Sequence, residues 1–357
     1  MSISFTIVDV FSKTQFKGNP LAIVDNTADI LSETQMKIIS RQFNLSETTF
    51  FSPPTVPSAT YRLRSFLPDG REVFGAGHNI LGVWWWLATA GFLDLSKPNS
   101  TDKSNGVEEF IFHQQLGDDV LPVKVMRIAR DESSSGQTGS LDSPAEISIS
   151  IRQISPNFYN FHPNPAELAQ SFGLTAADIG LSQDAARTRN NSSNPLRPQV
   201  VSTSTTRHLL VPISSVSALN RASVQRDKLL QQLSIVDNKA YGLYLFTPMP
   251  SSPDSRGKNI YQARFFSPGM SAEDPATGSA AGPLSAYLYK HGHLDITGSV
   301  GKLTIQQGIK VGRECWINVT LSVTTIGDSE VLNMDLSGGG VKVASGEIAL
   351  PSIDLHF

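Results

Sequence analysis

The sequence predicts an α+β protein of two similar halves, each a curved, mostly antiparallel, barrel-like sheet around a central helix. Three observations predict this class. The 357 residues exceed one ordinary core and fit two domains of average size. Strand patterns dominate and helix patterns are few and isolated, so we do not expect parallel βαβ units. One short motif recurs 200 residues later, and each copy precedes an apolar helix.

The recurring motif is Arg-x-Phe-x-Pro, at residues 64–68 and again at 264–268. The two copies share an arginine, a phenylalanine, a proline and two later glycines in the same order. Five matched features rarely recur by chance, so the repeat indicates two related halves. A helix that is apolar on nearly all sides must be surrounded by structure, and a curved antiparallel sheet is the simplest enclosure. Each motif is followed by a glycine beside a polar residue, a second glycine and an apolar helix: Gly77-His78 with Gly82, and Gly278-Ser279 with Gly282.

We expect the first half to cover residues 1–150, with its central helix at about 79–92. The second half would cover 151–357, with its central helix at about 279–291, and the last strand could return to the first half. Four stretches rich in Pro, Ser and Asn interrupt these halves and predict surface loops. They lie at 97–106, 131–143, 187–198 and 248–258.

Local patterns predict the individual elements. Ser32 starts a helix, because Gln35 follows three residues later as in a capping box. Further helices are expected at 165–172 and 224–233. Alternating or β-branched runs predict strands, at residues 2–11, 21–24, 47–51, 61–66, 71–74, 109–113, 121–128, 147–152, 208–211, 242–246 and 262–267, and repeatedly from 302 to 350.

The overall charge and the cysteine content exclude several classes of function. The net charge is −3 and no Lys/Arg-rich run is present, which argues against nucleic-acid binding. The single cysteine, Cys315, can form neither an internal disulfide nor a cysteine-based zinc site. The N-terminus shows no secretory pattern, and the apolar run Ile80–Leu93 is shorter than a membrane span of about 20 residues. We therefore expect a cytoplasmic protein.

No set of metal ligands is evident in the sequence. His291 and His293 lie close together, but they follow the second central helix in a polar turn. We interpret them as charges at the end of that helix rather than as ligands.

Both central helices begin at glycine next to a polar side chain. The free N–H groups and the dipole at a helix start bind anions, so two such starts that face each other would form a carboxylate-binding cleft. Ordinary helix capping is the alternative. Asp274, Thr277 and Ser279 gather at the second start, where they either cap the helix or hold substrate and pass protons. His78, at the first start, has the same two roles open to it.

Glu47 lies between the end of a helix and an apolar strand. A glutamate at such a place is partly desolvated, which raises its pKa and favours acid/base chemistry near neutral pH. A solvated surface glutamate is the alternative. Glu72, Glu273 and Glu347 are the competing candidates.

Several motifs, in this order along the chain, resemble those of PhzF-like (phenazine-biosynthesis-like) proteins, relatives of diaminopimelate epimerase. The blocks span almost the whole chain. They are Asp9-Val10-Phe11, Gly18-Asn19-Pro20-Leu21-Ala22, Leu45-Ser46-Glu47-Thr48-Thr49-Phe50, Ala76-Gly77-His78 with Leu81-Gly82, Glu273-Asp274-Pro275-Ala276-Thr277-Gly278-Ser279-Ala280-Ala281-Gly282, and Gln307-Gly308 with Val311-Gly312-Arg313.

The resemblance implies a diaminopimelate epimerase-like fold with the site between the two halves. It implies that Glu47 is the acid/base, assisted by His78, Asp274 and Ser279. It also implies an enzyme without metal or organic cofactor, commonly a homodimer. With it we expect the substrate to be contacted by Asn19, Gly77, Asn79, Thr277 and Gly278.

Epimerases of this fold that use two thiols need a cysteine at each helix start. This chain has Ala76-Gly77 and Thr277-Gly278 there, whereas Cys315 lies far along the chain in an expected strand. A two-thiol racemase is therefore excluded. The chain also departs from the family at Asn79-Ile80, where Pro-Thr or Ala-Thr is frequent, and at the bulky run Trp84–Trp86, so its substrate could differ.

These inferences lead to one hypothesis. The chain would be an isomerase that transfers a proton on a small carboxylate-bearing substrate, with a single carboxylate, Glu47, as the base. Ser279 and the glycine amides would hold the substrate carboxylate or the developing enolate charge. The alternative is a non-catalytic ligand-binding or interaction protein on the same scaffold, which would have no need of a carboxylate at position 47.

Overall fold

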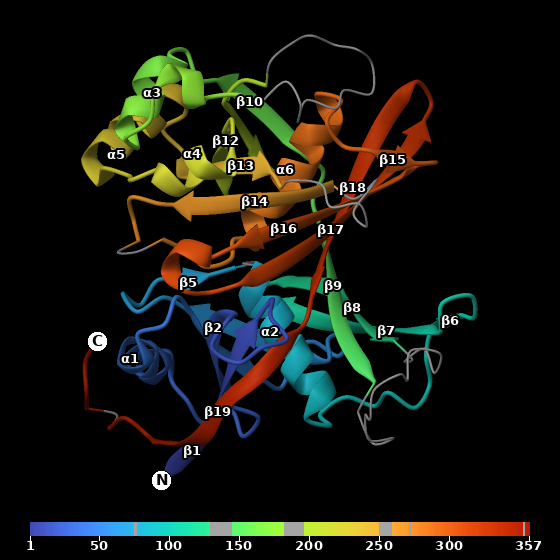
Figure 1. The fold of residues 1–357 in the computed structure, drawn as a ribbon. Coiled ribbons are helices and arrows are strands. Elements are labelled where there is room, and N and C mark those ends of the chain that lie inside the picture. The colour runs from blue at the N-terminus through green and yellow to red at the C-terminus, as the bar shows by residue number, and fades with distance from the viewer. Residues whose placement is uncertain (75–76, 129–144, 182–195, 250–258, 271–272, 353) are drawn as a thin grey trace, which may run out of the picture. The chain divides into compact units, whose positions relative to one another are not determined.

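The computed structural model describes residues 1–74, 77–128, 145–181, 196–249, 259–270, 273–352 and 354–357. The chain forms two compact units. Unit 1 consists of Met1–Phe16, Pro20–Ile151 and Ser337–Phe357, and unit 2 of Lys17–Asn19 and Arg152–Leu336. Figure 1 shows the elements of both units in chain order.

In its described residues, unit 1 consists of a mixed sheet and two helices. Strand pairing runs in the order β19, β1, β2, β3, β4, β7, β8 and β9, with β5 added to β4 and β6 to β7. The elements are β1 (Ser2–Val10), β2 (Asn19–Asp25), α1 (Glu33–Phe43), β3 (Thr48–Ser52), β4 (Tyr61–Phe66), β5 (Glu72–Val73), α2 (Gly77–Thr89), β6 (Ser100–Asp102), β7 (Val107–Leu116), β8 (Asp119–Ile128), β9 (Glu146–Gln153) and β19 (Gly340–Ala349).

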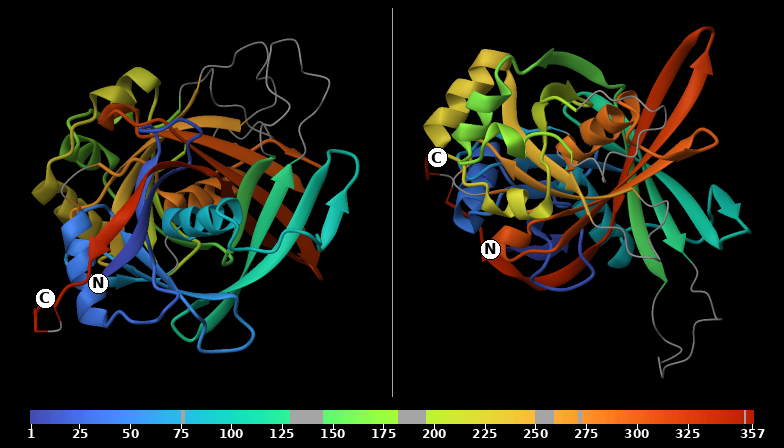
Figure 2. Two further views of the ribbon diagram at one scale, coloured as in Figure 1. Left: turned by 90° about the horizontal axis from the view of Figure 1, so that it is seen from below. Right: turned by 45° about the horizontal axis from the view of Figure 1, so that its top comes forward.

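Helix α2 is the core of unit 1. It contacts β1, β3, β8 and β19, so strands from both ends of the sheet order pack against it. In the left view of Figure 2, the cyan helix α2 lies within the curve of these strands. Trp84 is fully buried, and its indole N–H donates to Gln114. No helix among the described residues is long and apolar enough to span a membrane.

Unit 2 repeats this plan. Its strands pair in the order β10, β11, β12, β13, β14, β16 and β17, with β15 added to β16. Helix α6 contacts β11, β12 and β17. The elements are β10 (Asn157–Phe161), α3 (Pro165–Ser171), β11 (Gln199–Ser202), β12 (Arg207–Pro212), α4 (Val216–Arg221), α5 (Arg226–Val236), β13 (Ala240–Pro248), β14 (Asn259–Phe266), α6 (Gly278–Lys290), β15 (Ile296–Thr297), β16 (Val300–Gln307), β17 (Cys315–Ile326) and β18 (Ser329–Gly338), with 3-10 turns at Ala176–Asp178 and Ile309–Val311.

The two units have the same strand connections at their centres. In unit 1, β2 pairs parallel with β3, β3 antiparallel with β4, and β4 parallel with β7. In unit 2, β12, β13, β14 and β16 follow the same sequence of parallel, antiparallel and parallel pairs. The two similar halves predicted from the motif repeat are therefore confirmed as two similar units.

The repeated Arg-x-Phe motif makes the same two contacts in each unit. Arg64 lies over the ring of Phe66, at 5.0 Å from its centroid, and pairs with Glu72 at 2.7 Å. Arg264 lies over Phe266 at 4.8 Å and pairs with Glu273, also at 2.7 Å. In each unit the arginine thus contacts the last residue of its own strand and a glutamate in the segment that follows this strand. We call this arrangement of arginine, phenylalanine and glutamate at the strand end a clasp, and its role is structural.

The second glycine after each motif lies within the central helix and has a packing role. A Cβ at Gly82 would clash with the side chains of Val10 and Leu21, and a Cβ at Gly282 with Gln153 and Thr203. Helices α2 and α6 can approach their surrounding strands closely only because these positions lack a side chain. These two glycines are explained by packing rather than by a ligand.

The expectation that parallel βαβ units are absent is wrong. Helix α1 connects the parallel pair β2 and β3, while α4 and α5 lie between the parallel strands β12 and β13. Strand β3 is buried at every residue because α1 and α2 both contact it. A short strand covered by helices carries no alternating pattern, so its place in a parallel pair was hidden in the sequence.

Most of the individual elements are as expected, including the capping box of α1. Ser32 accepts from the Gln35 amide, and the Gln35 side chain accepts from the Ser32 amide. The stretch 97–106 is exposed as expected, but it is not only loop, because it contains β6 paired with β7. The expected loop at 131–143 lies outside the described residues. So do residues 187–195 of the loop expected at 187–198 and residues 250–258 of the loop expected at 248–258. Strands β10 and β11 and helix α4 were not foreseen.

Candidate functional site

Glu47 lies directly before β3, in the turn that follows α1. The C-cap of α1 is Asn44, which has the left-handed conformation (φ 51°) and turns the chain toward the sheet. The Glu47 side chain keeps only 14% of its surface exposed. Burial raises the pKa of its carboxyl from 4.5 to about 7. The desolvation expected for this glutamate is therefore confirmed.

The three competing glutamates have other partners. Glu72 and Glu273 are each bound by an arginine of the repeated clasp. Glu347 is exposed and accepts a hydrogen bond from Ser2. Of these four glutamates, Glu47 alone is both largely buried and without an arginine or lysine partner among the described residues.

The start of α2 brings His78 to this carboxyl group. The Nε2 atom of His78 lies 3.2 Å from Oε2 of Glu47, close enough for an ion pair when the imidazole is protonated. Gly77 is the first residue of α2, two residues earlier than the expected start of the helix, so His78 and Asn79 lie in its first turn. Asn79 is buried, and its Oδ1 atom accepts from the amide of Ile80. Unit 1 thus contains one cluster of predicted site residues.

Unit 2 contains the second cluster, around Asp274. Its Oδ1 atom accepts from Nδ2 of Asn19 at 3.1 Å and from the amide of Ala276 at 3.4 Å. Its Oδ2 atom accepts from the hydroxyl of Thr277 at 2.7 Å. Asn19 is fully buried, and its Oδ1 atom has no hydrogen-bond partner among the described residues. The carboxylate therefore holds the turn that leads into α6.

Gln307, at the end of β16, ties this turn together. Its Nε2 atom donates to the carbonyl of Asp274 and to the hydroxyl of Thr277. Its Oε1 atom accepts from the Thr277 amide and the Tyr244 hydroxyl. Every polar group of this fully buried side chain is thus used in fixing the turn. The Thr277 side chain is bound by these neighbours.

The first turn of α6 is left open by this arrangement. Thr277 is the N-cap residue, but its side chain makes no capping hydrogen bond, and the first turn contains no acidic residue. Ser279 is partly exposed there, and its hydroxyl lies 3.0 Å from Nε2 of His208. The amides of Gly278 and Ser279 lack the intrahelical partners that later residues have. The helix start is therefore suited to an anionic group.

The interpretation of His291 and His293 as charges at a helix end is wrong. Burial is the main cause that lowers the pKa of both imidazoles, so both favour the neutral form. His291 is the C-cap of α6, and its Nε2 atom lies 3.2 Å from Oε1 of Gln199. In the part of the chain that the structure describes, no group of three or more His, Cys, Asp or Glu side chains could hold a metal ion.

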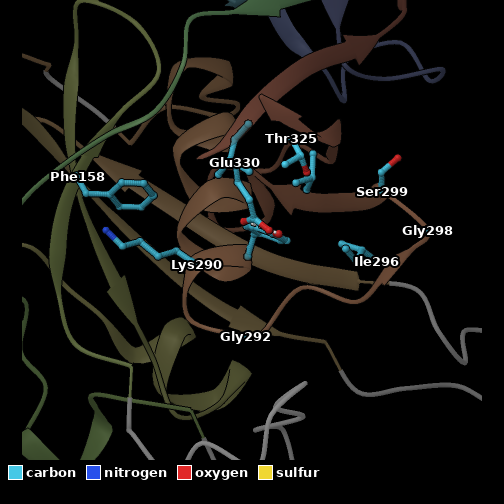
Figure 3. Close-up of a pocket in the computed structure, with 11 residues that line it drawn as sticks. Phe158, Lys290, Gly292, Ile296, Gly298, Ser299, Thr325 and Glu330 are labelled. Carbon is cyan, nitrogen blue, oxygen red and sulfur yellow. Dashed lines mark hydrogen bonds between the residues drawn. The ribbon is translucent and has the colours of Figure 1, made fainter. Parts of the chain in front are cut away.

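The surface cavity in unit 2 does not include the predicted site residues. It has a volume of about 760 Å³ and is lined in part by Phe158, Tyr289, Lys290 and Glu330. Figure 3 shows Lys290 extended toward Phe158, with its ammonium 3.8 Å from the ring centroid. Tyr289 donates to Glu330 on the opposite side. These side chains already satisfy one another, which favours a structural role for them over ligand binding.

The structure therefore gathers the predicted residues into two clusters, one in each unit. Glu47, Gly77, His78 and Asn79 belong to unit 1, and the other predicted residues to unit 2. That the two helix starts share one cleft stays a prediction. Two residues that contact the unit 2 cluster, His208 and Gln307, were given no role in the sequence analysis. Gln307 stood within a recognised motif, whereas a lone histidine in an apolar strand gives no signal.

Comparisons with known proteins agree with this architecture. The model of a family described as phenazine biosynthesis-like protein (PhzC-PhzF) matches residues 8–120 and 131–346. An uncharacterized isomerase of Clostridium acetobutylicum is 26% identical over 96% of this chain and 97% of its own length. A trans-2,3-dihydro-3-hydroxyanthranilate isomerase of Pseudomonas chlororaphis is 26% identical over 97% of this chain and 99% of its own.

Solved structures give the same result for the fold. A PhzF-family phenazine biosynthesis protein of Bacillus anthracis has a TM-score of 0.75 and 23% identity, covering 98% of this chain and 99% of its own. A predicted epimerase of Pseudomonas aeruginosa has a TM-score of 0.66 and 25% identity, covering 98% and 100%. The curated relatives named isomerases support an isomerase role for this chain.

Proposed function

Because this chain belongs to the phenazine biosynthesis-like family and is an isomerase, we propose that Glu47 carries out its proton transfer, on a small carboxylate-bearing substrate and without a cofactor. The supporting observation is the buried carboxyl of Glu47, whose pKa is raised to about 7. A group with this pKa is present in both forms near neutral pH, so it can accept a proton and return it.

The proposed reaction needs no other reagent. Glu47 removes a proton from one carbon, and the electron pair moves into the conjugated system of the substrate. The protonated Glu47 then delivers the proton to another carbon, so substrate and product have the same composition. His78, whose Nε2 atom lies 3.2 Å from the carboxyl, is placed to stabilise its charged form or to pass the proton on.

The unit 2 cluster would hold the substrate. The uncapped first turn of α6 offers backbone N–H groups, and Ser279 adds a hydroxyl. Asp274 fixes the preceding turn through Thr277 and Asn19. The buried Oδ1 atom of Asn19 remains an acceptor for a donor group of the substrate. This proposal requires the two clusters to act on one molecule, in an enzyme that we expect to be a homodimer.

The name of the Pseudomonas chlororaphis relative suggests the first compound to assay, trans-2,3-dihydro-3-hydroxyanthranilate. Other cyclic amino acids with a proton next to a conjugated carboxylate form the wider panel. Each would be incubated with enzyme in heavy water and followed by NMR for isomerisation and deuterium uptake.

The decisive comparison is between the unaltered enzyme and Glu47→Gln. The variant keeps the shape of the side chain but cannot exchange a proton, so turnover should fall by at least about 1000-fold while substrate affinity stays within a few-fold. Glu72→Gln, which alters a clasp glutamate of the same unit, is the matched control and should keep turnover. Equal turnover in Glu47→Gln would refute the proposal. Activity that disappears on exhaustive chelation would contradict the part that excludes a cofactor.

A further inference from the structure

His208 contacts the hydroxyl of Ser279 in unit 2. It is on β12, is fully buried, and places Nε2 at 3.0 Å from Oγ of Ser279. The imidazole packs edge-on against Phe265 and Tyr241, with ring centroids 5.3 and 6.2 Å away. These rings fix its orientation, so the imidazole presents a single nitrogen to Ser279.

The surroundings of the other imidazole nitrogen, Nδ1, indicate which of the two nitrogens carries the proton. Nδ1 of His208 is buried and has no hydrogen-bond partner among the described residues. A buried N–H group without an acceptor is rarer than an unused lone pair, so the proton belongs on Nε2. Burial also lowers the pKa of His208 to about 3, which keeps the ring neutral at neutral pH. Nε2–H therefore donates to Ser279.

A serine hydroxyl that accepts from His208 has its own proton free to donate elsewhere. We propose that His208 is a positioning residue, which donates to Ser279 and so directs the serine hydroxyl proton outward to an acceptor oxygen of the substrate. This inference rests on the proposed function. The start of α6 would then offer donors from both Ser279 and the backbone. Such a site binds a carboxylate and rejects an ammonium or amide N–H at the same place.

The first test uses the protein without any ligand. Histidine labelled with ¹⁵N would be incorporated, and the tautomer of His208 would be read from its long-range ¹⁵N–¹H correlations, assigned by their loss in His208→Gln. We expect the Nε2–H tautomer, unchanged between pH 5 and 9. Ser279→Ala should shift the Nε2 signal, whereas His162→Gln, at another buried histidine of unit 2, should not. The Nδ1–H tautomer, or titration in this range, would overturn the inference.

The second test measures binding of anthranilate, an aromatic carboxylate, by calorimetry. His208→Phe keeps an aromatic ring among Phe265 and Tyr241 but removes the donor. It should weaken binding roughly tenfold, as should Ser279→Ala, and the double variant should be no worse than either single one. Anthranilate binding unchanged in His208→Phe but weakened in Ser279→Ala would refute the positioning role.

The outcomes of these tests are separable from those of the proposed function. The tautomer concerns the unliganded protein, and it stands or falls without reference to Glu47. An unexpected tautomer leaves the Glu47→Gln comparison unaffected. Conversely, turnover retained in Glu47→Gln would remove the proposed reaction while the His208–Ser279 hydrogen bond remained as measured.

Discussion

The Oε2 atom of Glu47 lies 3.2 Å from the Nε2 atom of His78, and the two residues come from different parts of the sequence. Glu47 precedes β3, whereas His78 is the second residue of α2, the helix that β3 contacts. The fold therefore brings a largely buried carboxyl to an imidazole. A buried carboxyl without a cationic partner is costly to the folded state, and that cost can be measured.

The stability of Glu47→Gln should depend on pH in a defined way. Below pH 4.5 the carboxyl is protonated in both the folded and the unfolded chain. Between pH 4.5 and about 7 only the folded chain keeps the proton, so its stability falls as pH rises. Above pH 7 the full penalty is about 3 kcal/mol. Chemical unfolding should therefore show Glu47→Gln to be more stable than the unaltered protein at pH 8, by about that amount.

The gain in stability of Glu47→Gln over the unaltered protein should shrink toward zero at pH 4.5. Glu72→Gln should instead be destabilising at pH 8, because it removes the partner of Arg64. A gain for Glu47→Gln that is the same at pH 4.5 and pH 8 would show that the carboxyl is not desolvated.

Asp274→Asn should separate a structural from a catalytic role. Three donors face the carboxylate, so the amide places an N–H group against one of them and lowers stability by about 1–3 kcal/mol. If the charge also assists proton transfer, turnover should fall by roughly 100-fold under conditions where the variant is folded. Thr277→Val removes one of the same hydrogen bonds and keeps the charge, so it should lose far less turnover. Equal losses of turnover in both variants would show that the role of Asp274 is structural.

The two clasps should differ in strength. Arg264 and Glu273 are almost completely buried, and Arg264 also donates to the carbonyls of Leu219 and Ala222. Arg64 keeps 18% of its side chain exposed. Removing one partner of a buried pair costs about 3–5 kcal/mol. Urea unfolding should therefore show a loss of that size for Arg264→Met and a clearly smaller one for Arg64→Met, and similar losses would contradict this difference.

The shared cleft can be tested with cysteines. Ser46 and Ser279 are partly exposed residues beside the two clusters, and the single native cysteine, Cys315, is buried. In the double variant Ser46→Cys/Ser279→Cys, a short bifunctional maleimide should join the two positions within one chain, as detected by mass spectrometry of peptides. The control pairs Ser46→Cys with Ser217→Cys, on the exposed side of α4. Crosslinking only in the control would place Glu47 apart from the start of α6.

The sequence predicted most of the elements because their signals are local. The capping box of Ser32 and Gln35, the apolar helix α2 and the repeated Arg-x-Phe-x-Pro motif each depend on residues close in the chain. The parallel pairs β2–β3 and β12–β13 depend on contacts across a helix, and short buried strands have no alternation to reveal them.

The sequence analysis named the candidate site residues but not the side chains that hold them in place. Glu47 and His78 were recognised through motifs, and the pKa shift followed from the position of Glu47 beside an apolar strand. The hydrogen bonds of Gln307 and His208 join residues 30 and 71 positions apart, and nothing in either local sequence indicates the partner. Such long-range polar contacts come from tertiary packing alone.

The pairing of β1 with β19 has a consequence for how the protein is made. Ser2 pairs with Ala349 and Val10 with Gly340, so β1 needs as its neighbour a strand that is synthesised much later. During translation, the strands of unit 2 can assemble while β1 still lacks this partner, because Arg152–Leu336 precede β19. The unit that carries Glu47 is therefore begun before unit 2 and completed after it, and a ribosome that stalls before β19 leaves an edge of β1 open to chaperones or aggregation.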